Sequence, residues 1–261
     1  MSIAPRPVTT TDAWKALGLI IITIDHVGHY FLPDWPMLRA IARSSLLIWF
    51  FFLGFGKGGV VPLRWLVFGV VLTLADYLRL GQANLVLINI LFSFALIRLI
   101  FPYVERHILP HPFALSGLVI ALLALSPFAK PVLEYGTMGP LIALVGLVHR
   151  RTLEAPASLP RYAREGLGLI AIMAFGYTER SDYGFSPHHL VVMAFGLALT
   201  MAALLRFRRT DLSWRPGEGK LKTAMQFCGR YSLELYVGQL LLFTSINWLL
   251  NIDIFGDEYE G

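Results

Sequence analysis

The stretch LVLINILFSFALIRLIF (residues 85–101) is a continuous apolar run with one charged residue, and the run VVMAFGLALTMAALL (residues 191–205) has none. A helix of about 20 apolar residues crosses the ~30 Å hydrocarbon core of a bilayer. Lipid offers no hydrogen bonds to the backbone, so only helices and closed barrels span it, and barrel strands alternate apolar and polar residues. These runs do not alternate, so they predict membrane-spanning helices.

The composition of the whole chain agrees with this interpretation. Of its 261 residues, 56% are hydrophobic and only 15% are charged, and the mean hydropathy is +0.62. A soluble domain carries roughly 25% charged residues, which excludes an ordinary water-facing surface. The net charge of +5 does not indicate a nucleic-acid partner, because membrane proteins gather Lys and Arg on their cytoplasmic side. The single cysteine, Cys228, excludes an internal disulfide.

The sequence predicts an all-α integral membrane protein, a single domain over residues 1–261 with membrane lipids around it. We expect a bundle of about nine transmembrane helices, with eight to ten possible. The first apolar run carries charged residues and no cleavage site, so we interpret it as a retained helix rather than a signal peptide. Prolines such as Pro102 are expected at span ends. The expected spans are 14–32, 41–56, 61–80, 84–101, 113–128, 132–149, 166–178, 187–205 and 231–250.

The distribution of cations predicts the orientation. With the N-terminus inside, 17 of the 22 Lys and Arg residues fall in inside segments, and the positive-inside rule selects this topology. Residues 1–12 then form a short cytoplasmic segment. The acidic residues 251–261 form an extracytoplasmic tail, consistent with nine spans.

Polar residues inside the spans gather toward the predicted outer face. An unpaired charge at mid-membrane costs roughly 2.5–3.5 kcal/mol, so charges at one depth should face one another or a wet cavity. They are either structural ion pairs or parts of a functional site, and the sequence leaves both interpretations open. The set inside the spans comprises Asp25, His26, His29, Arg43, Asp76, Arg79, Asn89 and Gln239, and the connection before the eighth span adds Asp182 and Tyr183.

His26 is the strongest candidate for chemistry. An imidazole beside a carboxylate, here Asp25, can serve as a general base. A zinc site is the competing idea, but the His-x-x-His spacing of His26 and His29 is too weak a signature, so we predict no metal. Cys228 lies at the inner end of the ninth span, away from these residues, and is not expected to be a nucleophile.

Three segments resemble the TraX-like family of membrane proteins. The first span, AWKALGLIIITIDHVGHYFLPD, carries an Asp-His-x-Gly element at residues 25–28. LINILFSFAL is similar to the family's Asn-x-Leu-Phe-Thr helix, and SDYGFSPHHL to its Asp-Tyr-Gly element. The second span keeps Arg43 but lacks the family's Gly and Pro. The last helix, GRYSLELYVGQLLLF, resembles the closing helix of transmembrane acyltransferases, with Gln239 where a His is often found.

The resemblance implies a membrane-embedded acyltransferase of the bacterial inner membrane. Such an enzyme would acetylate a conjugative pilin subunit or another extracytoplasmic acceptor with cytosolic acetyl-CoA. His26, oriented by Asp25, would be the base, and Asn89 or Arg43 would stabilise the oxyanion. Contacts to the acceptor are expected from His29, Asp76, Arg79, Asp182, Tyr183 and Gln239. The acetyl-CoA phosphates are expected to meet Arg150, Arg151, Arg206, Arg208 and Arg209.

Two other functions remain open from the sequence alone. Ionisable residues inside spans also mark proton-coupled transporters, although no inverted repeat or paired broken helices are evident. A non-catalytic pilus or envelope assembly factor is the second alternative.

Overall fold

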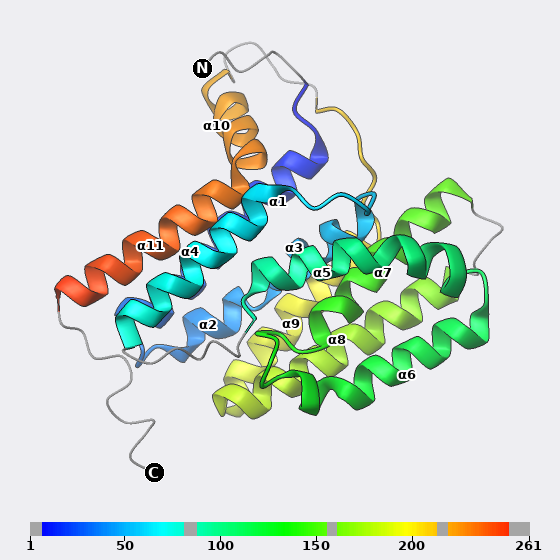
Figure 1. The fold of residues 1–261 in the computed structure, drawn as a ribbon, viewed down its shortest axis with the longest axis horizontal. Helices are drawn as coiled ribbons and strands as arrows, with labels where there is room; N and C mark the ends of the chain where they lie inside the picture. Colours follow the sequence, from blue (N-terminus) through cyan, green and yellow to red (C-terminus); the bar gives the residue numbers. More distant parts are fainter. Residues whose placement is uncertain (1–6, 81–87, 156–160, 213–218, 251–261) are drawn as a thin grey trace.

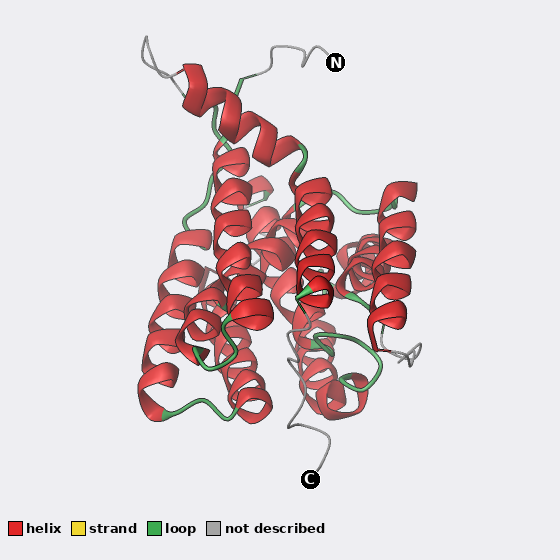
Figure 2. Cartoon of the chain, turned by 90° about the vertical axis from the view of Figure 1, so that its left-hand side faces the viewer, coloured by secondary structure: helices red, strands yellow, loops and turns green. Residues whose placement is uncertain are grey.

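A computed structural model describes residues 7–80, 88–155, 161–212 and 219–250. Within these ranges the regular secondary structure is helical, and turns, loops and two isolated bridge pairs make up the rest (Figure 2). The helices are α1 (Thr10–Phe31), α2 (Pro36–Ala42), α3 (Ser44–Phe55), α4 (Leu63–Leu80), α5 (Ile90–Tyr103), the π-helix η1 (Val104–Ile108), α6 (Pro112–Ala129), α7 (Met138–Glu154), α8 (Arg161–Tyr183), α9 (Pro187–Leu204), α10 (Gly219–Arg230) and α11 (Ser232–Leu249).

Several helices begin at residues that suit a helix start. Thr9 caps α1: its side chain accepts a hydrogen bond from the backbone N–H of Asp12, whose carboxylate accepts one from Thr9 in return. Proline occupies the first positions of α2, α6 and α9, where its missing N–H has no helical partner to lose. Asn89 caps α5 by accepting from the backbone of Leu91.

The helix α3 lies at the centre of the bundle. It packs against α1, α5, α7 and α9. In Figure 1, α1, α4 and α11 run along one flank, and α6, α7, α8 and α9 lie on the other side of α3. The two flanks are thus joined through the most apolar helix of the chain.

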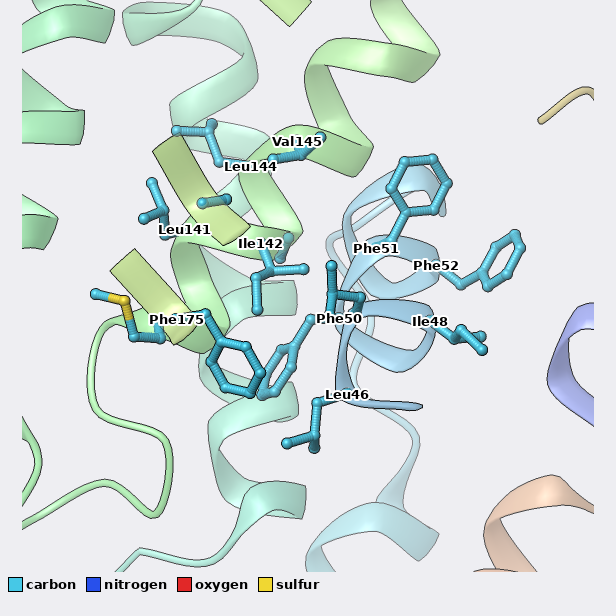
Figure 3. Close-up of a cluster of buried hydrophobic side chains, with 14 of the residues drawn as sticks. Leu46, Ile48, Phe50, Phe51, Phe52, Leu141, Ile142, Leu144, Val145 and Phe175 are labelled. Atoms are coloured by element: carbon cyan, nitrogen blue, oxygen red, sulfur yellow. The ribbon is translucent and has the colours of Figure 1, made fainter. Parts of the chain in front are cut away.

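The contact between α3 and α7 is made close by glycine. A Cβ on Gly54 would come within 1.8 Å of the carbonyl oxygen of Ala143, and one on Gly146 within 2.0 Å of that of Phe51. Without these Cβ atoms the two backbones touch, and Phe50 and Ile142 pack beside them in the core (Figure 3). The close approach fixes the position of α3, which carries Ser44 and Ser45 at the end next to Arg43.

Three helical stretches of the described chain are long and apolar enough to cross a membrane: Pro36–Phe55, Pro112–Ala129 and Pro187–Leu204. The nine expected spans are therefore matched only in part by this criterion. The helices α5 and α7 have 14 and 17 residues, which at 1.5 Å per residue gives lengths of about 21 and 26 Å. These are short for the ~30 Å hydrocarbon core.

The structure corrects several expected boundaries. The span expected at 132–149 begins only at Met138, because residues 131–137 form turns, and the span expected at 166–178 extends over Arg161–Tyr183. Pro102 lies inside α5 rather than at a helix end, and the π-helix η1 follows it. The predicted inner loop before the last span contains a further helix, α10, which the sequence did not predict. Residues 251–261, the expected acidic tail, lie outside the described residues.

Candidate functional site

A buried ion-pair network joins three helices at the end of the bundle predicted to be outside. Arg43, only 2% exposed, hydrogen-bonds Asp25 of α1 through Nη2 and Glu179 of α8 through Nη1, the latter at 3.1 Å. Arg39 of α2 adds a second cation, 3.8 Å from Asp25. Asp25, Arg43 and Glu179 thus face one another, whereas Asp76 of the predicted polar set is exposed. The pairing is the one that the ion-pair interpretation expects, because Asp25 and Arg43 are direct partners.

The residues of the predicted Asp-Tyr-Gly element cover this network. The guanidinium of Arg39 lies 4.2 Å from the ring centre of Tyr183, and that of Arg43 lies 5.1 Å from it. Asp182 forms an ion pair with Lys130, which follows α6. The sequence prediction thus brought Asp25, Arg43 and Tyr183 into one set correctly, while their roles stay predictions.

His26 is buried on a different side of α1 from Asp25. Consecutive helical residues project about 100° apart, so a carboxylate and an imidazole at adjacent positions point apart. The imidazole Nδ1 lies 3.1 Å from the amide nitrogen of Gln239 in α11. Among the described residues, no hydrogen bond joins His26 to Asp25. The side chain that orients this imidazole is therefore Gln239, which the sequence analysis placed only among the acceptor contacts.

The same amide also reaches a threonine. Thr23 Oγ1 lies 3.0 Å from Gln239 Oε1 and 2.7 Å from the carbonyl oxygen of Leu19. The hydroxyl has one proton, so it donates to only one of these oxygens. Amide oxygen and nitrogen exchange places on a half-turn, and their assignment follows from the complete network. The chain Leu19–Thr23–Gln239–His26 thus has two possible proton arrangements.

A cavity of about 180 Å³ lies between α1, α3, α4, α5 and α11. Its wall includes Tyr236, whose ring centre lies 5.6 Å from that of His26. Aromatic and aliphatic side chains such as Trp49, Phe52 and Phe94 form most of the rest. One tyrosine therefore stands between this cavity and the buried imidazole.

Other predicted site residues lie around this centre. The Asn89 amide donates to the carbonyl of Gly69 (2.8 Å) and to Thr73 (3.0 Å) while its oxygen caps α5, so an oxyanion role would require one of these bonds to break. His29 stacks edge-on against Tyr30, with ring centres 4.8 Å apart. Asp76 is exposed on α4, and the side chain of Arg79 lies outside the described part of the chain.

The arginines expected to hold acetyl-CoA form no common site with the cavity. Arg150 pairs with Glu105 at 2.8 Å and with Glu154 at 3.4 Å, and Arg151 lies 3.6 Å from Glu105. Arg206, Arg208 and Arg209 are exposed at the end of α9 and beyond it. None of these five residues is part of the cavity wall.

Two residues of the turn before α7 also lie at the site, and the sequence did not predict them. Glu134 accepts a hydrogen bond from the backbone N–H of Ile90 at 2.7 Å, and burial raises the pKa of its carboxyl to about 7. Tyr135 lines both the large cavity and a second, smaller pocket beside Glu179 and Tyr183. Both residues lie between two apolar runs. The local sequence of such a turn does not show whether the turn packs inside the bundle or faces outward, so their burial could not be predicted.

Comparisons with known proteins give one distant likeness. An uncharacterized protein of Rickettsia prowazekii (strain Madrid E) is 28% identical over 156 residues, which are 58% of this chain and 61% of that protein. The matched region spans about three-fifths of the relative's length. No family model matches the sequence, and no solved structure matches it.

Proposed function

We propose that this chain is a membrane-embedded acyltransferase that moves an acetyl group from cytosolic acetyl-CoA to a pilin-like or other extracytoplasmic acceptor. The observation that carries the proposal is the enclosure of His26, which is 8% exposed, held by Gln239, and one tyrosine away from a cavity. A buried imidazole with a polar partner, next to a cavity, is an arrangement that suits general-base catalysis. The resemblance to TraX-like proteins gives the reaction class.

The proposed topology has nine spans in the bacterial inner membrane, formed by α1, α2 with α3, α4, α5, α6, α7, α8, α9 and α11. The sorting of charged residues supports it. Lys15, Arg64, Arg98 and Arg230, all assigned to the inside by the cation count, line one cavity. On the outer side of this topology, Asp25 and Glu179 pair with Arg43, and Arg39 lies 3.8 Å from Asp25. The helix α10 would lie at the inner membrane surface.

The proton arrangement around Gln239 fits a base. Thr23 donates to Leu19 over the shorter 2.7 Å distance, as a helical threonine commonly does four residues back. With the Gln239 amide turned by a half-turn, so that its oxygen rather than its nitrogen lies beside Nδ1 of His26, the amide nitrogen donates to Thr23 Oγ1 and the amide oxygen accepts from Nδ1–H of His26. Every group is satisfied, and the lone pair of Nε2 is left for chemistry.

In the proposed reaction the acceptor amine attacks the thioester carbonyl as Nε2 of His26 takes a proton from it. The tetrahedral intermediate collapses as the C–S bond breaks, and the imidazolium returns the proton to the leaving thiolate, giving free CoA and an amide. The charges of Arg43 and Asp25 remain paired throughout, since they hold α1, α3 and α8 together rather than touch the reacting atoms.

The experiment is to reconstitute the purified chain in liposomes, supply acetyl-CoA, and follow the release of CoA thiol with and without an amine-bearing pilin peptide. We expect slow hydrolysis alone and faster release with the peptide. Neither release nor acetylated product, from a preparation that is monodisperse, would refute the proposal.

A proton-coupled transporter is the second candidate, and one observation favours it. Tyr135 lines both the large cavity and the smaller pocket near the opposite end, so a single side chain separates them. The same liposomes, loaded with a pH-sensitive dye, distinguish the two functions. Proton flux without thiol release would favour transport.

A further inference from the structure

The cavity wall has an unusual charge. Four cationic side chains line it, from the start of α1 (Lys15), the start of α4 (Arg64), the second half of α5 (Arg98) and the end of α10 (Arg230). Among the described residues of the wall there is no Asp or Glu. Arg64 and Arg230 are exposed, so an anion from solution can reach this part of the wall.

The cations lie at one end of the cavity. Arg98 donates through Nε to the carbonyl of Val60 at 2.5 Å, and Arg64 pairs with Glu234 at the start of α11 at 2.7 Å. These contacts bring Arg98 next to the α3–α4 connection and Arg64 next to the start of α11. At the other end are Tyr236, near His26, and Tyr135 from the turn before α7. Between the two ends the wall is apolar.

This division indicates the chemistry of the ligand. Arginine binds phosphate oxygens through charge-assisted hydrogen bonds, often two at a time. The aromatic part of the wall, with Trp49 and Phe94, suits an uncharged arm rather than a second ionic group. A free phosphate ion would use only the cationic end. The fitting ligand is a phosphate-bearing molecule with a long uncharged arm that reaches toward the tyrosines.

We propose that Lys15, Arg64, Arg98 and Arg230 bind the phosphate groups of the acyl donor, whose arm occupies the cavity and presents its thioester toward Tyr236. This inference rests on the proposed acyl transfer. It replaces the loop arginines as the donor site, since Arg150 and Arg151 are already engaged by Glu105 and Glu154. A membrane phospholipid shares the phosphate-plus-arm chemistry, so the test includes it.

Binding, rather than turnover, tests the site. The purified full-length chain in detergent is titrated with acetyl-CoA and with acetyl-pantetheine, the same thioester arm without phosphates, by isothermal titration calorimetry. A hydrogen bond to a charged group contributes roughly 1.5–3 kcal/mol, and each 1.4 kcal/mol is tenfold in affinity. We therefore expect acetyl-CoA to bind at least about 100-fold more tightly. Equal affinities would overturn the phosphate assignment.

Variants locate the site. Arg98→Gln and Arg230→Gln should each weaken acetyl-CoA binding about tenfold or more and leave acetyl-pantetheine binding unchanged, while Arg98→Lys should retain most of the affinity. Lys57→Gln is the matched control, because Lys57 is an exposed cation in the α3–α4 connection outside the cavity wall. If Lys57→Gln weakens binding as much as Arg98→Gln does, general inner-surface charge is responsible and the inference is wrong.

A lipid-binding experiment distinguishes the two sources of phosphate. The chain is placed in nanodiscs of phosphatidylcholine with or without phosphatidylglycerol, and retained lipid is counted by native mass spectrometry. Acetyl-CoA that displaces phosphatidylglycerol supports the donor site. A different result would be that acetyl-CoA does not bind while the Arg98→Gln and Arg230→Gln variants retain less phosphatidylglycerol. The cavity would then be a lipid-phosphate site. The donor assignment would be wrong, and the acyl-transfer proposal would have no donor site. If neither ligand depends on these arginines, the anion site itself is refuted.

Discussion

The amide of Gln239 lies 3.1 Å from Nδ1 of His26, and this contact makes α11 the helix that orients the imidazole. Asp25, the sequence neighbour of His26, instead pairs with Arg43. Two adjacent polar residues of α1 therefore belong to different interaction networks. One is part of an ion-pair network, and the other is part of a hydrogen-bonded chain that ends beside a cavity.

The first prediction concerns Gln239. Gln239→Glu still accepts a hydrogen bond from Nδ1–H and should keep turnover within about tenfold, whereas Gln239→Leu should lower kcat on the order of 10²-fold with little change in KM. Nitrogen-15 NMR of histidine-labelled protein reads the tautomer directly. We expect the Nδ1–H form in the wild type and in Gln239→Glu. An Nε2–H form in the wild type would contradict the assigned proton arrangement, whatever the activity.

The ion-pair network gives the second prediction. Asp25→Asn leaves the buried Arg43 with one carboxylate instead of two, and breaking a buried pair costs about 3–5 kcal/mol. We expect a lower melting temperature in detergent, measured by size-exclusion after heating, with turnover per folded molecule largely kept. Glu179→Gln should behave in the same way. A variant that melts as the wild type does but has lost turnover would assign Asp25 to the chemistry, as the sequence analysis supposed.

Close packing of α3 on α7 gives the third prediction. Gly54→Ala and Gly146→Ala each insert a methyl group within 2.0 Å of a backbone oxygen, so the helices must separate. Overpacking of this kind costs about 1–3 kcal/mol or more. Gly117→Ala in α6 is the control, since nothing lies within 4 Å of the added Cβ and alanine favours a helix by roughly 0.5–1 kcal/mol. Equal melting temperatures for all three variants would rule out the close contact.

The fourth prediction is a pH dependence of stability from Glu134, which lies in the turn before α7. Burial raises the pKa of its carboxyl from 4.5 to about 7, so the folded state binds this proton more tightly than the unfolded state does. Its stabilising contribution is complete below pH 4.5 and is lost as the pH rises through about 7.

Glu134→Gln keeps the oxygen that accepts from Ile90 but has no such proton. The melting temperature of the wild type relative to this variant should therefore fall between pH 5 and pH 8, by an amount corresponding to about 3 kcal/mol at most. A constant difference across this range would show that Glu134 does not titrate there.

The sequence predicted the helical class and the meeting of the outer charges because both follow from single-residue energetics. Apolar runs must become helices in lipid, and Asp25 and Arg43 at one depth must find partners. It did not predict that Tyr135 folds inward, because the path of a turn depends on the helices it packs against. The pairing of His26 with Gln239 required knowing that α1 and α11 are neighbours. Gln239 was part of the predicted polar set, but its partner could not be identified from the sequence.

The expectation that Arg150 and Arg151 meet the donor phosphates stays a prediction, and it rests on charge alone. A cation count identifies the predicted inner face but does not separate arginines that balance local carboxylates from those that line a cavity. Lys15, Arg64, Arg98 and Arg230 lie far apart in the sequence, and only the packing of α1, α4, α5 and α10 around the cavity brings them together.

Turnover of His26→Ala per folded molecule is the most direct test of the acyl-transfer account. The variant is compared with the wild type and with His111→Ala, an exposed histidine before α6, and CoA release is normalised to the monodisperse peak in detergent size-exclusion. Loss of a general base lowers rates by about 10²–10⁴-fold, so His26→Ala should fall by that factor while His111→Ala stays at the wild-type rate. A folded His26→Ala protein that turns over as fast as the wild type would contradict the account.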